Sequence, residues 1–216
     1  MIRLFVLLAF ALGTTFAASA ATAQSSKAKR YAACVSDRNG KEVRKLMQAT
    51  SADAANMPYH ELINDDRCFS RVFGDQPFRP QDAAESVAML RGNLAEHALK
   101  ADAGKIAALQ ALPLQQKRYI RPWFAATGRH PAVDEMGACM ADTDPAGIMA
   151  LIRTNPGYAD EGAAVSALTP ALTKCLSAGT RLDANRPALR AALADALYQR
   201  MTNPALSVAQ STETPK

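Results

Sequence analysis

The chain has 216 residues, a formal net charge of +5, 49% hydrophobic residues and only 6% aromatic residues. So modest a positive charge argues against nucleic acid as the partner. Alanine is abundant and runs of alternating β-branched residues are missing, so the composition favours an all-α fold.

The first 23 residues have the pattern of a secretory signal peptide. Arg3 supplies a positive charge, residues 4–12 form an unbroken apolar run, and small residues follow it. The A-x-A motifs at residues 18–20 and 21–23 both offer cleavage sites, and we favour a cut before Gln24. An uncleaved anchor is the less favoured alternative, because the run is short for a membrane span of roughly 20 residues. We therefore expect a protein exported to the periplasm or the extracellular space, with no transmembrane segment after cleavage.

The four cysteines form two similar pairs, Cys34 with Cys68 and Cys139 with Cys175. An even number of cysteines in an exported chain favours disulfides. Four cysteines allow three connectivities, and a duplication favours pairing within each copy. A zinc site built from all four thiolates is the competing interpretation, but its closely spaced C-x2–4-C pairs are absent.

The sequence around each cysteine pair predicts a helical repeat, at residues 24–102 and 134–203, within a single compact or bilobed domain. Five residues after the first cysteine of each pair comes a helix-breaking pair, Asn39-Gly40 or Asp144-Pro145. The break separates a short helix with the cysteine from a second helix whose apolar residues recur at i, i+3 and i+4. These apolar residues are Val43, Leu46 and Met47 in the first copy and Ile148, Leu151 and Ile152 in the second.

Two further helices are expected in each repeat. The third returns antiparallel and ends at the second cysteine. The fourth begins at Arg79-Pro80 or Arg186-Pro187, since proline is favoured at the first helical position. Both fourth helices contain the phrase Leu-Arg-x-x-Leu-Ala, at residues 90–95 and 189–194. The third helices match poorly, and a chance likeness between two alanine-rich stretches is the alternative to a duplication.

The second of these phrases also carries a family resemblance. Residues 188–198 read Ala-Leu-Arg-Ala-Ala-Leu-Ala-Asp-Ala-Leu-Tyr and follow a Cys-stapled unit. This stretch resembles the ending of a group of uncharacterised exported bacterial helical proteins, and the resemblance covers mainly residues 134–200. It implies export and a helical fold, and it brings no known activity, ligand or cofactor.

A basic and aromatic bridge, residues 103–133, joins the two repeats. It contains no Asp or Glu, and its five basic residues are Lys105, Lys117, Arg118, Arg121 and Arg129. Removal of residues 1–23 leaves the chain with a net charge of +4, so the bridge is more positive than the whole.

Two interpretations of the bridge stay open. Arginine and aromatic side chains dominate binding hot spots, so it could bind an anionic envelope component or an acidic protein. The candidate binding residues are Lys117, Arg118, Tyr119, Arg121 and Trp123. Alternatively, Tyr119, Ile120, Trp123 and Phe124 pack as core between the repeats with the cations around them. The two readings are compatible if the rings face inward and the guanidinium groups outward.

The residues that could carry chemistry form no recognised motif. His60-Glu61 begins like a zinc-protease motif, but Asn64 stands where its second histidine is needed. Glu61, Asp65 and Asp66 could form an acid/base pair or simply a solvated acidic face. The nucleophile-elbow, phosphate-loop and dinucleotide fingerprints are missing. The sequence therefore predicts no catalytic residue, metal ligand or cofactor.

His130 precedes Asp134 and Glu135 and could pair with one of these carboxylates. The favoured alternative is that Asp134 caps the helix carrying Cys139, with Glu135 in its first turn. His97 stands late in an expected helix, where a histidine is ordinary.

The sequence thus predicts an exported all-α protein that acts as a binding or structural module of the cell envelope. The alternatives are a periplasmic enzyme, such as a hydrolase, and a chaperone-like accessory factor. Residues 204–216 are rich in Ser, Thr, Pro and Gln and are expected to be disordered.

Overall fold

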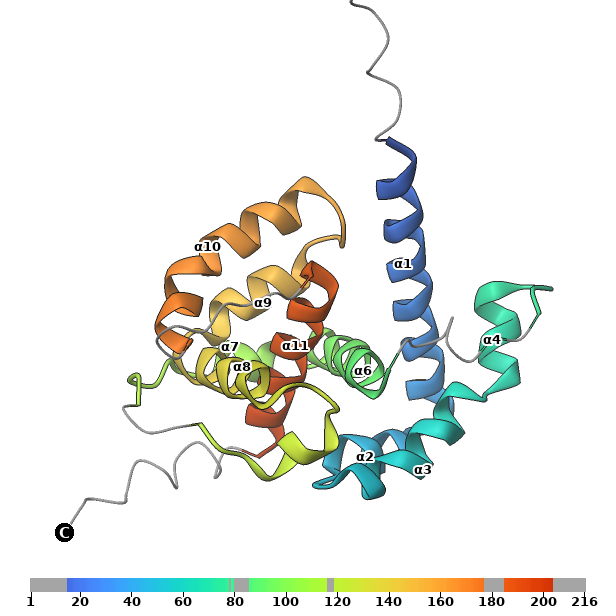
Figure 1. Cartoon of the computed structure of the whole chain (residues 1–216), viewed down its shortest axis with the longest axis horizontal. Helices are drawn as coiled ribbons and strands as arrows, with labels where there is room; N and C mark the ends of the chain where they lie inside the picture. Colours follow the sequence, from blue (N-terminus) through green and yellow to red (C-terminus); the bar gives the residue numbers. More distant parts are fainter. Residues whose placement is uncertain (1–14, 78, 80–85, 116–118, 177–184, 204–216) are drawn as a thin grey trace, which may run out of the picture.

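Figure 1 shows a computed structural model of the chain. The structure describes residues 15–77, 79, 86–115, 119–176 and 185–203. Within these residues it contains ten α-helices, one 3-10 helix and no strand, which confirms the all-α prediction. The alanine-rich composition and the buried stripes of the helices account for this result.

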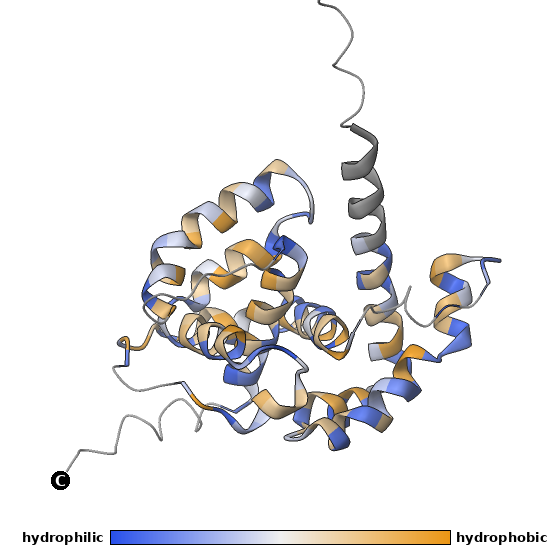
Figure 2. Ribbon diagram, in the orientation of Figure 1, coloured by the Kyte–Doolittle hydropathy of each residue, from blue (hydrophilic) through white to orange (hydrophobic). Residues whose placement is uncertain are grey.

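The first half of the protein comprises five described helices: α1 (Thr15–Arg38), α2 (Gly40–Gln48), α3 (Ala52–Ile63), α4 (Asp66–Phe73) and α6 (Val87–Ala101). The chain breaks between α1 and α2 at Asn39, as predicted. Figure 2 shows hydrophilic and hydrophobic residues mixed along α2, α3 and α4, as expected of helices with one buried face.

The second half contains four helices: α8 (Pro131–Thr143), α9 (Pro145–Arg153), α10 (Ala159–Cys175) and α11 (Arg186–Thr202). Between the halves lie the short helix α7 (Ala103–Ala107) and the 3-10 helix η1 (Pro122–Ala126). Asn185 caps α11, its side chain accepting a hydrogen bond from the Ala188 N–H, and Pro187 lies in the first turn. This start agrees with the prediction.

Both predicted disulfides are present. Cys34 is bonded to Cys68, with 5.7 Å between their Cα atoms, and joins α1 to α4. Cys139 is bonded to Cys175, with 5.6 Å between their Cα atoms, and joins α8 to α10. In the chain-entropy picture, closing loops of this size stabilises the fold by about 3–4 kcal/mol each.

The third helix of the first half differs from its prediction. It is broken into α3 and α4, so Cys68 lies in the first turn of α4 instead of ending a helix. The reason is local, because Asp65 caps α4 by accepting a hydrogen bond of 2.8 Å from the Cys68 N–H. In the second half, α10 is continuous and ends at Cys175 as predicted.

The fourth helix of the first half is described from Val87, and Ser86 caps it by accepting a hydrogen bond from the Met89 N–H. The start predicted at Arg79-Pro80 involves Pro80, which lies outside the described residues. The expected disordered tail, residues 204–216, also lies outside them.

Helix α11 lies at the centre of the molecule, between α6 and α8 (Figure 1). Small residues permit this close packing. An added Cβ on Gly92 of α6 would lie 2.3 Å from the Ala191 Cβ of α11, and one on Gly137 of α8 would lie 3.2 Å from the Ala196 Cβ. Larger side chains at these positions would therefore push the helix backbones apart.

Only part of the predicted signal peptide lies within the described residues. Residues 1–14 lie outside the described part, and residues 15–23 form the first turns of α1. Among the helices that the structure describes, none has both the length and the apolar character needed to cross a bilayer.

Candidate functional site

Tyr119 and Trp123 of the bridge are buried, and Phe124 is half-buried. The exposed fractions of Tyr119, Arg121 and Trp123 are 6%, 6% and 4%. The Tyr119 hydroxyl accepts a hydrogen bond of 2.9 Å from the Gln115 N–H, and the Trp123 ring meets that of Phe124 edge to face at 4.6 Å. Ile120, expected among the packed residues, is 60% exposed. The prediction for Ile120 is wrong because Ile120 precedes η1 and lies in no helix, so the i, i+3, i+4 spacing of an α-helix does not apply to it.

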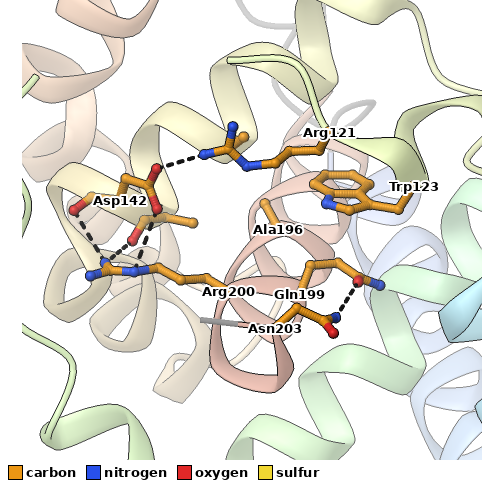
Figure 3. Close-up of a pocket in the computed structure, with 9 residues that line it drawn as sticks. Arg121, Trp123, Asp142, Ala196, Gln199, Arg200 and Asn203 are labelled. Atoms are coloured by element: carbon orange, nitrogen blue, oxygen red, sulfur yellow. Dashed lines mark hydrogen bonds and ion pairs between the residues drawn. The ribbon is translucent and has the colours of Figure 1, made fainter. Parts of the chain in front are cut away.

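The guanidinium group of Arg121 also faces inward, toward a carboxylate of α8. Its Nη2 lies 2.9 Å from Asp142 Oδ2, and Arg200 Nε of α11 lies 3.5 Å from Asp142 Oδ1 (Figure 3). Arg200 further donates hydrogen bonds to the carbonyl oxygens of Ala141 and Gln110. Asp142 thus lies between two arginines, one from the bridge and one from α11.

A cavity beside this cluster is lined by side chains that include Trp123, Gln199 and Asn203 (Figure 3). Its volume is about 10 Å³. A cavity of that size holds about one water molecule. It is therefore too small for an organic ligand.

Arg129, the other bridge arginine in the described residues, also pairs with buried carboxylates. Its Nε lies 2.7 Å from Asp134 Oδ1, and its Nη2 lies 2.5 Å from Asp195 Oδ2. Burial would raise the pKa of Asp195, but Arg91 and Arg129 outweigh it and hold that pKa below its usual value. For Asp134 burial dominates, and its pKa is raised despite Arg129.

These contacts account for much of the charge excess of the bridge. Arg121 and Arg129 neutralise buried carboxylates of the second half, and Lys105 pairs at the surface with Asp102 at 3.1 Å. Lys117 and Arg118 lie outside the described residues, so their role in binding stays a prediction.

The expected cap of α8 is wrong in one respect. His130 is the N-cap residue, and its Nδ1 accepts a hydrogen bond of 3.3 Å from the Ala132 N–H. Asp134 instead points inward and accepts a hydrogen bond of 2.6 Å from the Thr127 hydroxyl. The inward position of Asp134 is explained by the buried Arg129 that it neutralises.

The other candidate catalytic groups are separated or already engaged. Asp65 caps α4 and accepts a hydrogen bond of 2.6 Å from the Asn39 side chain, while Glu61 and Asp66 are exposed. His97 lies 4.0 Å from Asp37 near the surface. In the part of the chain that is described, no group of three or more His, Cys, Asp or Glu residues could hold a metal ion.

A reciprocal pair of ion pairs joins α6 to α11. Arg91 of α6 donates to both carboxylate oxygens of Asp195, at 2.9 and 3.1 Å. Arg190 of α11 donates to both oxygens of Glu96, at 2.8 and 3.0 Å. All four side chains are almost completely buried. Bidentate pairs of this kind are strong and fix the relative orientation of the two groups.

Glu96 also pairs with two lysines. Its Oε1 accepts from Lys29 at 2.6 Å and from Lys100 at 2.7 Å. Burial opposes ionisation of this carboxyl, but Arg190 and Lys29 outweigh it and lower the pKa of Glu96 to about 2. Burial is the larger influence on Lys29 and lowers its pKa to about 8, even though Glu96 opposes it.

A surface groove between α2 and α3 is large enough for a ligand group. Its volume is about 520 Å³, and its lining residues include Glu42, Lys45, Asp53 and Met57. The Glu42 Oε1 lies 2.8 Å from the Lys45 ammonium, which lowers the pKa of Glu42. Its Oε2 is buried and has no hydrogen-bond partner in the described structure. Met57 is 69% exposed at the edge of this groove.

Sequence reasoning did not identify either the groove or the reciprocal ion pairs. A signal for the ion pairs is present, because each Leu-Arg phrase is followed by an acidic residue five positions after its arginine, Glu96 or Asp195. Nothing comparable marks Glu42, whose position depends on how α2 and α3 pack.

Comparison of the chain with models of known protein families, with curated proteins and with solved structures gives no significant match.

Proposed function

We propose that this protein is an exported binding module of the cell envelope, built from two Cys-stapled repeats, which holds its partner in the groove between α2 and α3. The observation that carries the proposal is the groove itself. Its volume of about 520 Å³ falls within the usual range for ligand sites. It also combines an apolar contact, Met57, with a carboxylate oxygen of Glu42 that lacks a donor.

The chemistry of the groove favours a partner that brings a hydrogen-bond donor beside an apolar group. A donor placed on Glu42 Oε2 would supply the hydrogen bond that this oxygen lacks. Exposed methionine adapts its shape to varied apolar surfaces, and Met57 would supply that contact.

Export is supported by two further observations. The chain begins with the pattern of a signal peptide, and all four cysteines are in disulfides, as is usual in oxidising compartments. Within the envelope, a disulfide-bonded helical body would present the groove on a stable support.

Photo-crosslinking in cells tests the binding site. A photoreactive amino acid at Met57 is expected to form a crosslinked adduct. The same amino acid at Tyr158, which is 64% exposed on the second half, should form none. Glu42→Gln should weaken the Met57 adduct without changing the melting temperature by more than a few degrees. Equal adducts from both positions, or none from Met57, would refute the groove as the binding site.

The contribution of Lys117 and Arg118 is tested separately. If these residues attract an anionic partner, Lys117→Glu with Arg118→Glu lowers capture of that partner at low salt and has less effect at high salt. Capture that is unchanged at low salt would remove them from the proposal.

A further inference from the structure

The ion pairs between α6 and α11 remain the same in kind when the roles of the two helices are exchanged. Arg91 of α6 binds the acid of α11, Asp195, and Arg190 of α11 binds the acid of α6, Glu96. In each helix the acid follows the arginine by five positions. Each helix therefore offers the same pair of groups to the other, in antiparallel order.

The arginines also make matching contacts within their own halves. Arg91 Nη1 donates to the Leu46 carbonyl oxygen of α2, and Arg190 Nη1 donates to that of Leu151 of α9 at 2.8 Å. Leu46 and Leu151 each stand twelve residues after the first cysteine of their half, Cys34 or Cys139. The correspondence thus extends from the helix pair to the second helix of each half.

The crossing point of the two helices also falls at matching positions. Gly92 and Ala191 each follow directly after the arginine of their helix, and an added Cβ on Gly92 would lie 2.4 Å from the Ala191 Cα. In an interface with twofold symmetry, each contact occurs twice, with the two partners exchanging roles.

From these relations we infer that α6 and α11 form a self-complementary interface like that of a homodimer. The two halves of the chain would therefore bind each other even as separate polypeptides. The partner that this surface fits is a second copy of the same helical unit, supplied here within one chain. The inference rests on the duplication included in the proposed function, but it does not depend on the groove.

The interface has the properties of a stable association. Its centre is apolar, with Leu94 and Leu193 buried, and its two bidentate ion pairs are shielded from water. Shielded pairs of this kind lose little strength to salt. Arg121 and Arg129 contact mainly the second half, with which they would remain after a cut at residues 116–118. The bridge also adds contacts across the cut, because Arg200 donates to the Gln110 carbonyl oxygen and the Leu112 N–H donates to that of Asp142.

The test is to cut the folded protein. A site for a specific protease replaces residues 116–118, the purified protein is cleaved after folding, and the product is examined by native size exclusion at about 1 μM, a concentration at which moderately tight complexes persist. The two fragments should elute together at the position of the uncut protein, at low and at high salt. Fragments that elute separately would overturn the inference.

A substitution at the crossing point identifies the surface responsible. Gly92→Leu would force a side chain into Ala191, so the cut variant is expected to separate into fragments. Gly104→Leu in α7 is the matched control, because no atom lies within 4 Å of a Cβ added there. Its cut product should stay together. If cut Gly92→Leu also stays together, α6 and α11 are not the interface.

The wild-type experiment is informative even if Gly92→Leu fails to fold, since the cut is made in folded wild-type protein. The outcome is also separate from that of the Met57 crosslinking test. Loss of the Met57 adduct would leave the association of the halves unaffected, and separation of the halves would not argue against the groove.

Discussion

Arg190 and Glu96 face each other across α11 and α6 through two parallel hydrogen bonds, of 2.8 and 3.0 Å. The same guanidinium group donates to the Leu151 and Ile152 carbonyl oxygens, at 2.8 and 2.7 Å. Lys29 reaches the same carboxylate from α1 at 2.6 Å. The Glu96 carboxylate thus links three helices. Its two main cationic partners, Arg190 and Lys29, are expected to contribute different amounts to the stability of the fold.

We expect Arg190→Met to destabilise the protein strongly and Lys29→Met to have little effect. Loss of Arg190 leaves Glu96 and Glu161 as poorly compensated buried charges, which costs about 3–5 kcal/mol. Lys29 loses more by burial than it gains from Glu96, so its replacement should change the free energy of unfolding by less than about 1 kcal/mol. Urea denaturation of the two variants measures both values, and equal losses would contradict this account.

The position of Arg121 predicts a loss of stability on charge reversal. Arg121→Glu places a second carboxylate beside the buried Asp142 and should cost about 3–5 kcal/mol. Lys105→Glu, at an exposed position of the same segment, should cost less than about 1 kcal/mol. Thermal unfolding distinguishes them. A melting temperature for Arg121→Glu within a few degrees of wild type would show that the guanidinium is not needed inside.

The close contact at Gly92 predicts an unusual response to alanine. Alanine normally stabilises a helix by about 1 kcal/mol relative to glycine. At Gly92 the added Cβ would overlap Ala191, so a net loss of about 1–3 kcal/mol is expected. Gly104→Ala, which meets no neighbouring atom, is the control and should be neutral or stabilising. Stabilisation by Gly92→Ala would mean that the two helices lie farther apart.

The lowered pKa of Glu96 predicts sensitivity to acid. Its pKa is about 2 in the folded protein, below the ordinary 4.5. A carboxyl with a depressed pKa stabilises the folded state above its ordinary pKa, and this stability is lost as the pH falls from 4.5 toward 2. Asp195 contributes with the same sign. Asp134 has a raised pKa, so its contribution is lost as the pH rises and partly opposes the other two.

Glu96→Gln isolates this effect. The variant is less stable at neutral pH, but it should lose less further stability than wild type between about pH 5 and pH 3, because its residue 96 no longer titrates. Urea midpoints at the two pH values give the comparison. Parallel losses in the two proteins would assign the acid sensitivity to other groups.

The features that could be predicted from the sequence are those encoded by neighbouring residues. The cysteine spacing, the break at Asn39 and the start of α11 after Asn185 all depend on short-range patterns. The break before Cys68 also has a local signal, because Asp65 is a common helix-capping residue and accepts a hydrogen bond from the N–H three positions later.

The features that could not be predicted depend on partners distant in sequence. Arg91 and Asp195 are 104 positions apart, and helical periodicity gives the face of a residue but not its partner. The sequence leaves both a surface patch and a core open for Arg121 and Trp123, because only the packed structure brings Asp142 against Arg121. The groove at Glu42 has no sequence signature, since it follows from the angle between two helices.

The central position of α11 has a consequence for the order of folding. Arg91, Glu96 and Arg129 all find charge partners on this helix, which is the last of the described helices to be synthesised. Until it arrives, Arg91 lacks its carboxylate partner, and Glu96 and Arg129 each lack one of the partners that they have in the folded protein. The interior that α6, α8 and α11 share can therefore be completed only after the last described helix has been synthesised.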